Sequence, residues 1–177
     1  MPDQKTSPET KTRTYNYTVG AFDTALAMTA SGLEYMRALA SGELGPRPAI
    51  METMGTSTPF NLDYGQVSVE AQPADFLMNP LGVVHGGFAA TLLDTVLGIA
   101  VHTALPPATG YTTAELKVNY TRAILPTTER LRADGKLIYL GRKMATSEAR
   151  LVGVETGKLY AHGSTTCFLF SLQQGRE

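Results

Sequence analysis

The chain has 177 residues, enough for one domain with a sizeable core, and its hydrophobic fraction of 43% is ordinary for a globular protein. A formal net charge of −1 creates no long-range field, so charge indicates neither a nucleic-acid nor a membrane partner. The sequence contains no apolar run of the ~18 residues that a membrane-spanning helix needs, and its polar N-terminus lacks the apolar core of a secretory signal. A single cysteine, Cys167, cannot form an internal disulfide, and we expect a cytoplasmic location.

Threonine, lysine, proline and charged residues dominate positions 1–18, which predicts a mobile tail followed by one domain over 19–177. Apolar residues then recur at helical spacing and predict a helix over 23–41. Asp23 is its expected N-cap, and the glycines and prolines that follow Ser41 end it. We expect this helix to lie on the outside of the fold or beside the entrance to the site.

The pattern changes over 51–73, which reads as two short strands around a turn at Asp63, Tyr64 and Gly65. Residues 87–104 then predict a long helix that is apolar almost all round. A helix of this kind is buried rather than amphipathic.

The rest of the chain reads as four strands that alternate apolar and polar residues. Their predicted ranges are 111–122, 131–140, 144–155 and 159–170. Thr156 and Gly157 are a hairpin-turn signal between the last two. Long alternating strands joined by short turns predict an antiparallel sheet with one covered face. A single all-apolar helix is best buried if such a sheet curls around it, so the sequence predicts an α+β fold with a central helix.

His85, Gly86 and Gly87 stand where a turn meets the start of the long helix. Backbone N–H groups at a helix start are unpaired and aligned with the helix dipole, so they suit the oxyanion of a carbonyl under attack. The glycines would also let a substrate approach the backbone closely. Taken alone, this tripeptide is more often a tight turn that needs glycine.

Asp94 is the carboxylate of this apolar helix, eight residues after Gly86. Burying an unpaired charge is expensive, and buried acids cluster at functional sites. This favours catalysis over a carboxylate that bonds to Ser or Thr neighbours or faces solvent. At 1.5 Å per residue the two positions lie ~12 Å apart, too far to touch one carbonyl carbon. If both act on one substrate, they come from two subunits with antiparallel helices, which predicts an obligate dimer.

Three other polar residues near these positions each have two interpretations. Asn79 precedes a proline and is either a turn residue, which local chemistry favours, or an amide that orients a carbonyl or water. Thr112 and Thr113 begin a strand and are either β-formers on an edge or hydroxyls that position an attacking water.

A few residues are candidates for contacting the substrate or its phosphates. Gly87 and Thr112 lie next to the candidate catalytic positions. Arg122, Arg142 and Lys143 lie at predicted strand ends and could meet phosphates, although solvated strand ends are the commoner case.

The histidines are far apart in the sequence and show no metal-ligand spacing, so no metal site is predicted. His102 is interpreted as a partner of the helix dipole, His162 as structural and Cys167 as a small buried hydrophobe. Nucleotide-binding and serine-hydrolase motifs are absent from the sequence.

One combined motif is specific enough to suggest a family. It runs Asn79-Pro80-x-Gly82-x-x-His85-Gly86-Gly87 and, after six more residues, reaches Asp94. This motif resembles that of the PaaI-type acyl-CoA thioesterases, of the hotdog-fold superfamily that also holds 4-hydroxybenzoyl-CoA thioesterases. The resemblance extends from about residue 50 to the C-terminus. It implies a hotdog fold, in which a curled antiparallel sheet wraps a long helix, and dimers that commonly pair into tetramers.

Carried over position by position, the resemblance makes Asp94 the general base or the nucleophile. Gly86 then supplies the backbone N–H that polarises the thioester carbonyl. His85 and Asn79 match residues that shape and orient the site. Thr113 matches a Ser/Thr position that helps to hold the water, with the preceding threonine as the alternative.

These inferences lead us to expect hydrolysis of an acyl-CoA thioester to a free acid and CoA, without a metal or another cofactor. A hydratase of the same fold would pair a histidine with an acid in a different arrangement, so the spacing from Gly86 to Asp94 argues against it. A non-catalytic acyl-CoA-binding module is the other alternative, and the presence of Asp94 makes it less attractive. No nucleic-acid or membrane partner is expected.

Overall fold

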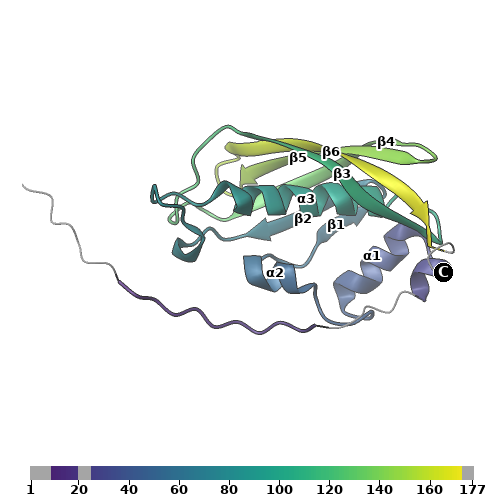
Figure 1. Ribbon diagram of the computed structural model, residues 1–177, viewed down its shortest axis with the longest axis horizontal. Helices are drawn as coiled ribbons and strands as arrows, with labels where there is room; N and C mark the ends of the chain where they lie inside the picture. The colour runs from purple at the N-terminus through teal and green to yellow at the C-terminus, as the bar shows by residue number, and fades with distance from the viewer. Residues whose placement is uncertain (1–8, 20–24, 173–177) are drawn as a thin grey trace, which may run out of the picture.

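A curled antiparallel sheet with a long helix against its inner face makes up most of the molecule (Figure 1). The computed structural model describes residues 9–19 and 25–172. The sheet has six strands in the order β1-β2-β4-β5-β6-β3, with antiparallel pairing throughout. The strands are β1 Phe60–Asp63, β2 Gln66–Ala71, β3 Thr109–Tyr120, β4 Leu131–Leu140, β5 Met144–Gly153 and β6 Leu159–Ser171.

Helix α3, Gly86–His102, lies inside the curl of the sheet because its side chains are apolar on most sides. Gly135 on β4 lets the sheet approach closely, since a Cβ there would lie 2.3 Å from the Val96 carbonyl oxygen. Ser147 Oγ on β5 donates to the Leu97 carbonyl oxygen at 2.9 Å. These contacts fix the position of the helix against the sheet. No helix in the described part of the chain is both long and apolar enough to cross a membrane.

A second layer of helices covers the side of α3 that faces away from the sheet (Figure 1). Its elements are the 3-10 helix η1 Leu26–Met28, α1 Gly32–Ser41 and α2 Ala49–Met54, and the 3-10 helix η2 Asp75–Leu77 follows β2. Helix α1 begins at a capping box in which Ser31 and Glu34 exchange hydrogen bonds, and it ends at Gly42 in the left-handed conformation.

The prediction of a central helix in an antiparallel sheet is confirmed. The long helix and the four C-terminal strands begin and end within two residues of their predicted bounds. The turn at Gly65 also joins two strands as predicted. The strand predicted from residue 51 is wrong at its start, because 49–54 form helix α2. The first helix is also shorter than predicted: α1 begins after Ser31, and Asp23 lies outside the described residues.

Residues 9–19, all but the last within the predicted tail, run as an extended segment beside α2 (Figure 1). Arg13 Nη1 donates to the Thr53 carbonyl oxygen at 2.8 Å, and its guanidinium lies 3.9 Å from the centroid of the Phe76 ring. Lys11 Nζ bonds to Asp75 at 2.8 Å. These residues therefore contact both α2 and η2. Residues 1–8 of the predicted tail lie outside the described residues.

Candidate active site

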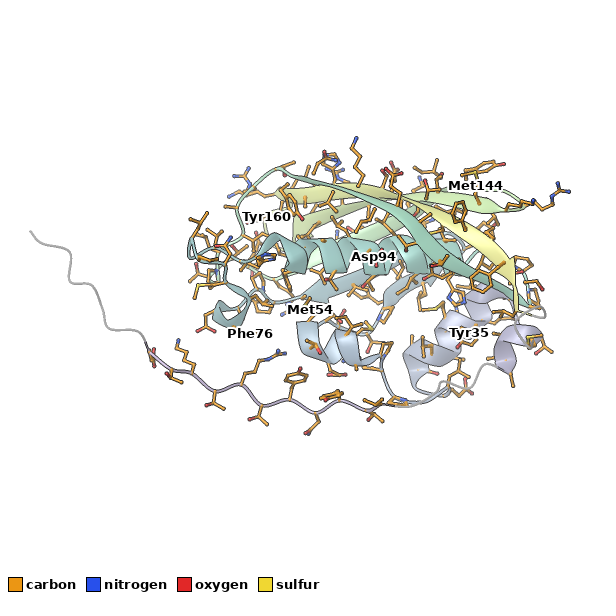
Figure 2. The ribbon with its side chains drawn as sticks, in the orientation of Figure 1. Tyr35, Met54, Phe76, Asp94, Met144 and Tyr160 are labelled. Carbon is orange, nitrogen blue, oxygen red and sulfur yellow. The ribbon has the colours of Figure 1, made fainter. Side chains whose placement is uncertain are left out.

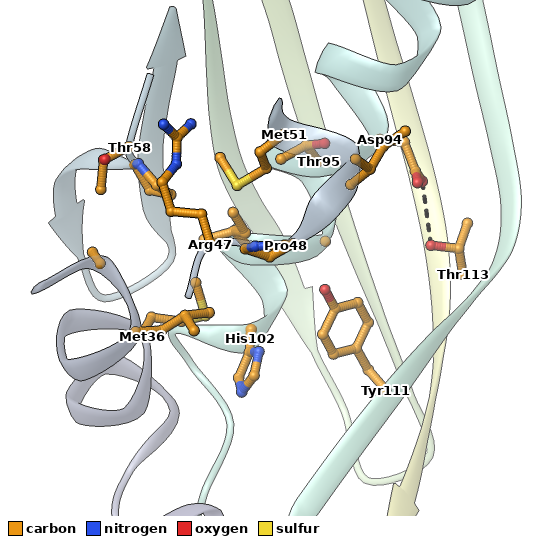
Figure 3. A pocket seen from close by; sticks show the side chains of 16 residues that line it. Met36, Arg47, Pro48, Met51, Thr58, Asp94, Thr95, His102, Tyr111 and Thr113 are labelled. Carbon is orange, nitrogen blue, oxygen red and sulfur yellow. Dashed lines mark hydrogen bonds between the residues drawn. The ribbon is translucent and has the colours of Figure 1, made fainter. Parts of the chain in front are cut away.

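Asp94 lies near the middle of α3 and lines a cavity between this helix and the layer of α1 and α2 (Figures 2 and 3). The cavity has a volume of about 250 Å³. Most of its wall is apolar and comes from Met36, Leu39, Ala40, Pro48, Ile50, Met51, Pro59, Gly98 and Ile99. Asp94 is partly buried there. Its carboxylate is thus exposed to an apolar space large enough for a ligand, rather than sealed within the core.

Thr113 on β3 is the hydrogen-bond partner of this carboxylate: its Oγ1 donates to Asp94 Oδ1 at 3.3 Å (Figure 3). Strand alternation turns Thr112 to the other face, where it pairs with the exposed Phe168. A register shift at Ala114 follows directly, a feature that is common beside functional sites. Of the two threonines considered from the sequence, the structure therefore brings Thr113 to Asp94.

The start of α3 has the geometry that the sequence suggested for an anion site. His85 is the N-cap, and its Nδ1 accepts the Gly87 N–H at 2.9 Å. The neutral ring therefore carries its proton on Nε2. This bond occupies the Gly87 N–H, and no acceptor for the Gly86 N–H is found within the described chain. Gly86 is left as the donor available to a ligand.

Asn79 holds the loop that leads into this helix start. Its Oδ1 accepts the backbone N–H of Leu81 at 2.9 Å and of Val83 at 3.4 Å. The His85 N–H in turn donates to the Leu77 carbonyl oxygen at 2.8 Å. Asn79 thus acts locally as the turn residue that its chemistry favoured, and it orients the backbone ahead of Gly86.

A second cavity, of about 370 Å³, opens at Gly86. Tyr120 lines this cavity, and its hydroxyl donates to the Gly86 carbonyl oxygen at 3.2 Å. Asn79 and Arg122 also line it. Arg122 is exposed, so a cation stands at this cavity, as the sequence suggested for a phosphate contact.

The two other basic candidates lie elsewhere in the chain. Arg142 and Lys143 are exposed on the turn between β4 and β5, and Arg142 lines a shallow groove with Phe170. Neither lines the Asp94 cavity or the Gly86 cavity. Within one chain, the structure groups Arg122 with Gly86 and leaves Arg142 and Lys143 away from both.

Gly86 and Asp94 open into different cavities of the same chain. Eight residues of helix separate them, a rise of ~12 Å. One reacting carbon cannot contact both positions within one chain. The geometry therefore consists of two half-sites on α3: a backbone donor at its start and a carboxylate near its middle.

Several residues of the Asp94 cavity were not identified from the sequence as site residues. Arg47 precedes α2, Tyr111 lies near the start of β3, and His102 ends α3. All three line the cavity (Figure 3). In the sequence, Arg47 is marked only by the prolines on either side of it, and Tyr111 only by its place before the paired threonines. Neither signal specifies a cavity, because the cavity forms where three separate elements pack together.

Burial sets the protonation of the groups around this cavity. The His102 ring stacks on Tyr35 with centroids 5.3 Å apart, and burial lowers its pKa to about 4. The ring is therefore neutral near pH 7, which argues against its interpretation as a partner of the helix dipole. Burial first, then the nearby Cys167 and Asp94, raises the pKa of Tyr111. Cys167 is fully buried, as predicted, and burial raises the pKa of its thiol. Within the described ranges, no cluster of His, Cys, Asp or Glu could hold a metal ion.

Comparison with known proteins finds a family match over the middle of the chain. The family model of the Thioesterase superfamily matches residues 81–159, which include the start of α3, Asp94 and Thr113. A candidate esterase of Halobacterium salinarum is 41% identical over 73 residues, which are 40% of this chain and 46% of that relative. The match thus spans less than half of the relative's own length.

Two solved structures extend the likeness to most of the fold. A candidate thioesterase from Ralstonia eutropha, described as phenylacetic acid degradation-related, is 27% identical with a TM-score of 0.67; the match covers 76% of this chain and 98% of that one. A variant of the phenylacetic acid degradation protein PaaI from Thermus thermophilus is 26% identical with a TM-score of 0.61, over 68% of this chain and 98% of that one. The chain thus has the hotdog fold of the thioesterase superfamily and resembles its PaaI-type proteins.

Proposed function

We propose that this protein hydrolyses an acyl-CoA thioester to a free acid and CoA. The observation that carries the proposal is the Asp94 carboxylate, which lines an apolar cavity and is bonded by the Thr113 hydroxyl. A carboxylate in this position can remove a proton from water or attack a carbonyl carbon. The likeness to the Thioesterase superfamily and to proteins of phenylacetic acid degradation supports a thioester of this kind.

The Gly86 N–H is the proposed donor to the carbonyl oxygen. The N–H group heads α3, so the helix dipole adds to its attraction for the developing oxyanion. The His85 cap keeps the neighbouring Gly87 N–H occupied and fixes the direction of the backbone. Arg122, at the same cavity, is the proposed contact for a CoA phosphate.

We propose that each active site is shared by two subunits of a homodimer, which pairs further into a tetramer. Within one chain, the ~12 Å separation keeps Gly86 and Asp94 from contacting the same carbonyl carbon. Two antiparallel α3 helices would bring the Gly86 of one subunit to the Asp94 of the other. Strand β3 supports such pairing, because it is a twelve-residue edge strand bonded on one side to β6. Exposed edges of this length are normally covered by another chain or element.

The proposed reaction uses only groups of the chain and water. Asp94 takes a proton from water as the water oxygen bonds to the thioester carbon, and the carbonyl oxygen becomes an oxyanion at the Gly86 N–H. The oxyanion collapses, the carbon–sulfur bond breaks, and CoA leaves as a thiolate that takes up a proton. In the alternative route Asp94 attacks directly, CoA leaves, and water cleaves the resulting anhydride. A cytoplasmic location stays a prediction of this proposal.

The test compares turnover of an acyl-CoA panel, beginning with phenylacetyl-CoA, by the wild-type protein, Asp94→Asn and the control Glu148→Gln. Glu148 is an exposed carboxylate on the outer face of the sheet. We expect Asp94→Asn to lose about 10²- to 10⁴-fold in kcat, the usual contribution of a general base, and Glu148→Gln to keep the wild-type rate. Equal rates for Asp94→Asn and the wild type would refute the role of Asp94.

A further inference from the structure

Tyr120 is the last residue of β3, and its side chain lies against the start of α3. It pairs with the fully buried Ala161 of β6, so its side chain points to the inner face of the sheet. A Cβ on Gly86 would come within 3.1 Å of the Tyr120 hydroxyl oxygen and of the ring carbon that carries it. Strand β3 thereby supports both half-sites, because Thr113 on the same strand bonds to Asp94.

Two side chains hold opposite ends of one peptide group at this helix start. The Tyr120 hydroxyl donates to the Gly86 carbonyl oxygen at 3.2 Å. The Gly87 N–H donates to His85 Nδ1 at 2.9 Å. This carbonyl and this N–H belong to the same planar peptide unit. A hydrogen bond accepted by the oxygen of a peptide makes its N–H a stronger donor, so the two bonds reinforce each other.

These bonds restrain the backbone of Gly86, which has little restraint of its own. A glycine can adopt backbone angles that are closed to other residues, and here a second glycine follows it. The peptide group before Gly86 is held by the bond from the Phe88 N–H to the His85 carbonyl oxygen at 3.0 Å. The peptide group after it is held by Tyr120 and the His85 ring. Because both flanking peptides are held, the Gly86 N–H keeps one direction, as an oxyanion donor requires.

The same chain of bonds selects the tautomer of His85. Its Nδ1 accepts a hydrogen bond and so carries no proton, which leaves the proton of the neutral ring on Nε2. The side chain is exposed, and no acceptor for the Nε2–H is found among the described residues. This donor stays available to a ligand while the Gly87 N–H occupies Nδ1.

We propose that Tyr120 is a positioning residue of the Gly86 half-site. Its hydroxyl acts through the peptide between Gly86 and Gly87. That peptide fixes the direction of the Gly86 N–H and keeps His85 in the tautomer with the proton on Nε2. Tyr120 itself needs no contact with the thioester. This inference rests on the proposed function and adds a residue that supports its oxyanion donor.

Tyr120→Phe tests the proposal, because it keeps the ring against Gly86 and removes one oxygen atom. We expect kcat for the best acyl-CoA to fall by about fivefold, the effect of one hydrogen bond, and KM to stay within about twofold. Hydrogen exchange of the Gly87 amide, followed by NMR, should quicken by a similar factor. The matched control is Tyr64→Phe, which removes a hydroxyl from a side chain that is 58% exposed on the turn between β1 and β2. The control should change neither kcat nor this exchange rate.

The His85 ring provides a further readout that does not depend on turnover. NMR of the imidazole nitrogens distinguishes the two tautomers, and a His85→Asn variant identifies the signals of this ring by their loss. We expect the wild type to show one tautomer, with the proton on Nε2, and Tyr120→Phe to show a measurable share of the other. The same tautomer in both proteins, together with unchanged Gly87 exchange, would overturn the proposal.

The combined readouts separate this inference from the proposed function. Faster Gly87 exchange and a mixed His85 tautomer in Tyr120→Phe, with no acyl-CoA turnover by the wild type, would support the chain of bonds and refute hydrolysis. Turnover by the wild type with the same kcat in Tyr120→Phe would support hydrolysis and refute the positioning role. A lower kcat with both NMR readouts unchanged would mean that Tyr120 contacts the substrate, which would overturn its action through the peptide.

Discussion

An apolar helix can accommodate Asp94 because its carboxylate lies at a cavity and accepts a hydrogen bond from Thr113. A carboxylate sealed among leucines would need a buried partner charge, which would occupy the oxygen atoms that the reaction requires. A hydroxyl partner leaves the second oxygen, Oδ2, free to accept a proton. The sequence showed an acid in apolar surroundings, and the structure adds the open space on one side of it.

At Gly86 one substitution removes the proposed donor without disturbing the helix. Gly86 is the first residue of α3, where proline is favoured because its missing N–H would lack an intrahelical acceptor anyway. His85 has the extended backbone, with φ −60° and ψ 138°, that a residue before proline requires. We expect Gly86→Pro to fold and to lose about 10²- to 10³-fold in kcat, the effect of removing one oxyanion donor.

The matched control is Gly86→Ala, which keeps the N–H and introduces the same Cβ, 3.1 Å from the Tyr120 hydroxyl. The Tyr120 side chain is 57% exposed and can shift. Gly86→Ala should therefore stay within a few-fold of the wild type. Similar kcat values for the proline and alanine variants, measured with the best acyl-CoA, would show that the Gly86 N–H takes no part in the reaction.

At the scale of elements, helix α2 forms one wall of the Asp94 cavity although it has only six residues. A helix this short has little stability of its own. Arg13 compensates from the N-terminal segment by donating to the Glu52 and Thr53 carbonyl oxygens in the last turn of the helix, of which the Glu52 oxygen also accepts the Gly55 N–H. Its guanidinium also covers the Phe76 ring of η2.

Replacing Arg13 by methionine should therefore loosen this wall of the Asp94 cavity. We expect Arg13→Met to lower the free energy of unfolding by about 1 kcal/mol and to raise KM more than it lowers kcat. Lys11→Met is the control, because Lys11 makes an exposed ion pair with Asp75, and such pairs contribute little. Chemical denaturation and steady-state kinetics measure both effects, and identical results for the two variants would contradict this role of Arg13.

The sequence predicted the elements whose pattern is long and regular. Helix α3 is a long, nearly unbroken apolar run, and the strands from β3 onward alternate with a period of 2 over ten or more residues. Helix α2 was missed because six residues cannot show a helical period. The start of α1 was placed too early, although Ser31 and Glu34 form a capping box that can be read from the sequence.

The placement of the catalytic candidates along α3 was predictable for a related reason. Asp94, Gly86 and His85 lie close together in the sequence and within one element, so spacing alone relates them. The other cavity residues Arg47, Tyr111 and His102 come from three separate parts of the chain. Their proximity depends on how α2 and β3 pack against α3, which no local pattern encodes.

At the scale of the whole molecule, burial of His102 links stability to pH. Its pKa falls from an ordinary 6.5 to about 4 in the folded chain, so the unfolded chain binds more protons between these values. The contribution of His102 to the free energy of unfolding is therefore fully present above pH 6.5 and is lost as the pH falls toward 4. We expect the free energy of unfolding to drop by about 1 kcal/mol per pH unit in this window.

His102→Phe keeps a ring between Tyr35 and Tyr111 and removes the titrating group. Denaturant titrations at pH 7.5, 5.5 and 4.5 should show a smaller loss of stability in this variant than in the wild type. Glu34 and Glu129 have lowered pKa values through bonds to Ser31 and Thr156, and their contribution at lower pH is common to both proteins. Parallel curves for the two proteins would contradict the linkage to His102.

At the level of the assembly, we propose that Gly86 of one subunit and Asp94 of another form one site. Strand β3 leaves an edge for a partner chain, and α3 carries both half-sites on one rigid element. Two variants that are each inactive can therefore be combined to test whether the site is shared. In a mixed dimer of Gly86→Pro and Asp94→Ala subunits, one of the two shared sites receives an intact Gly86 and an intact Asp94, and the other receives neither.

The measurement is the acyl-CoA hydrolysis rate after the two variants are unfolded together and refolded as a mixture. Random pairing makes half of the dimers mixed, each with one intact site, so a shared site predicts about a quarter of the wild-type activity. Each variant refolded alone should stay inactive. A mixture with no more activity than the separate variants would contradict the shared site, because every site formed within one chain carries one of the two lesions.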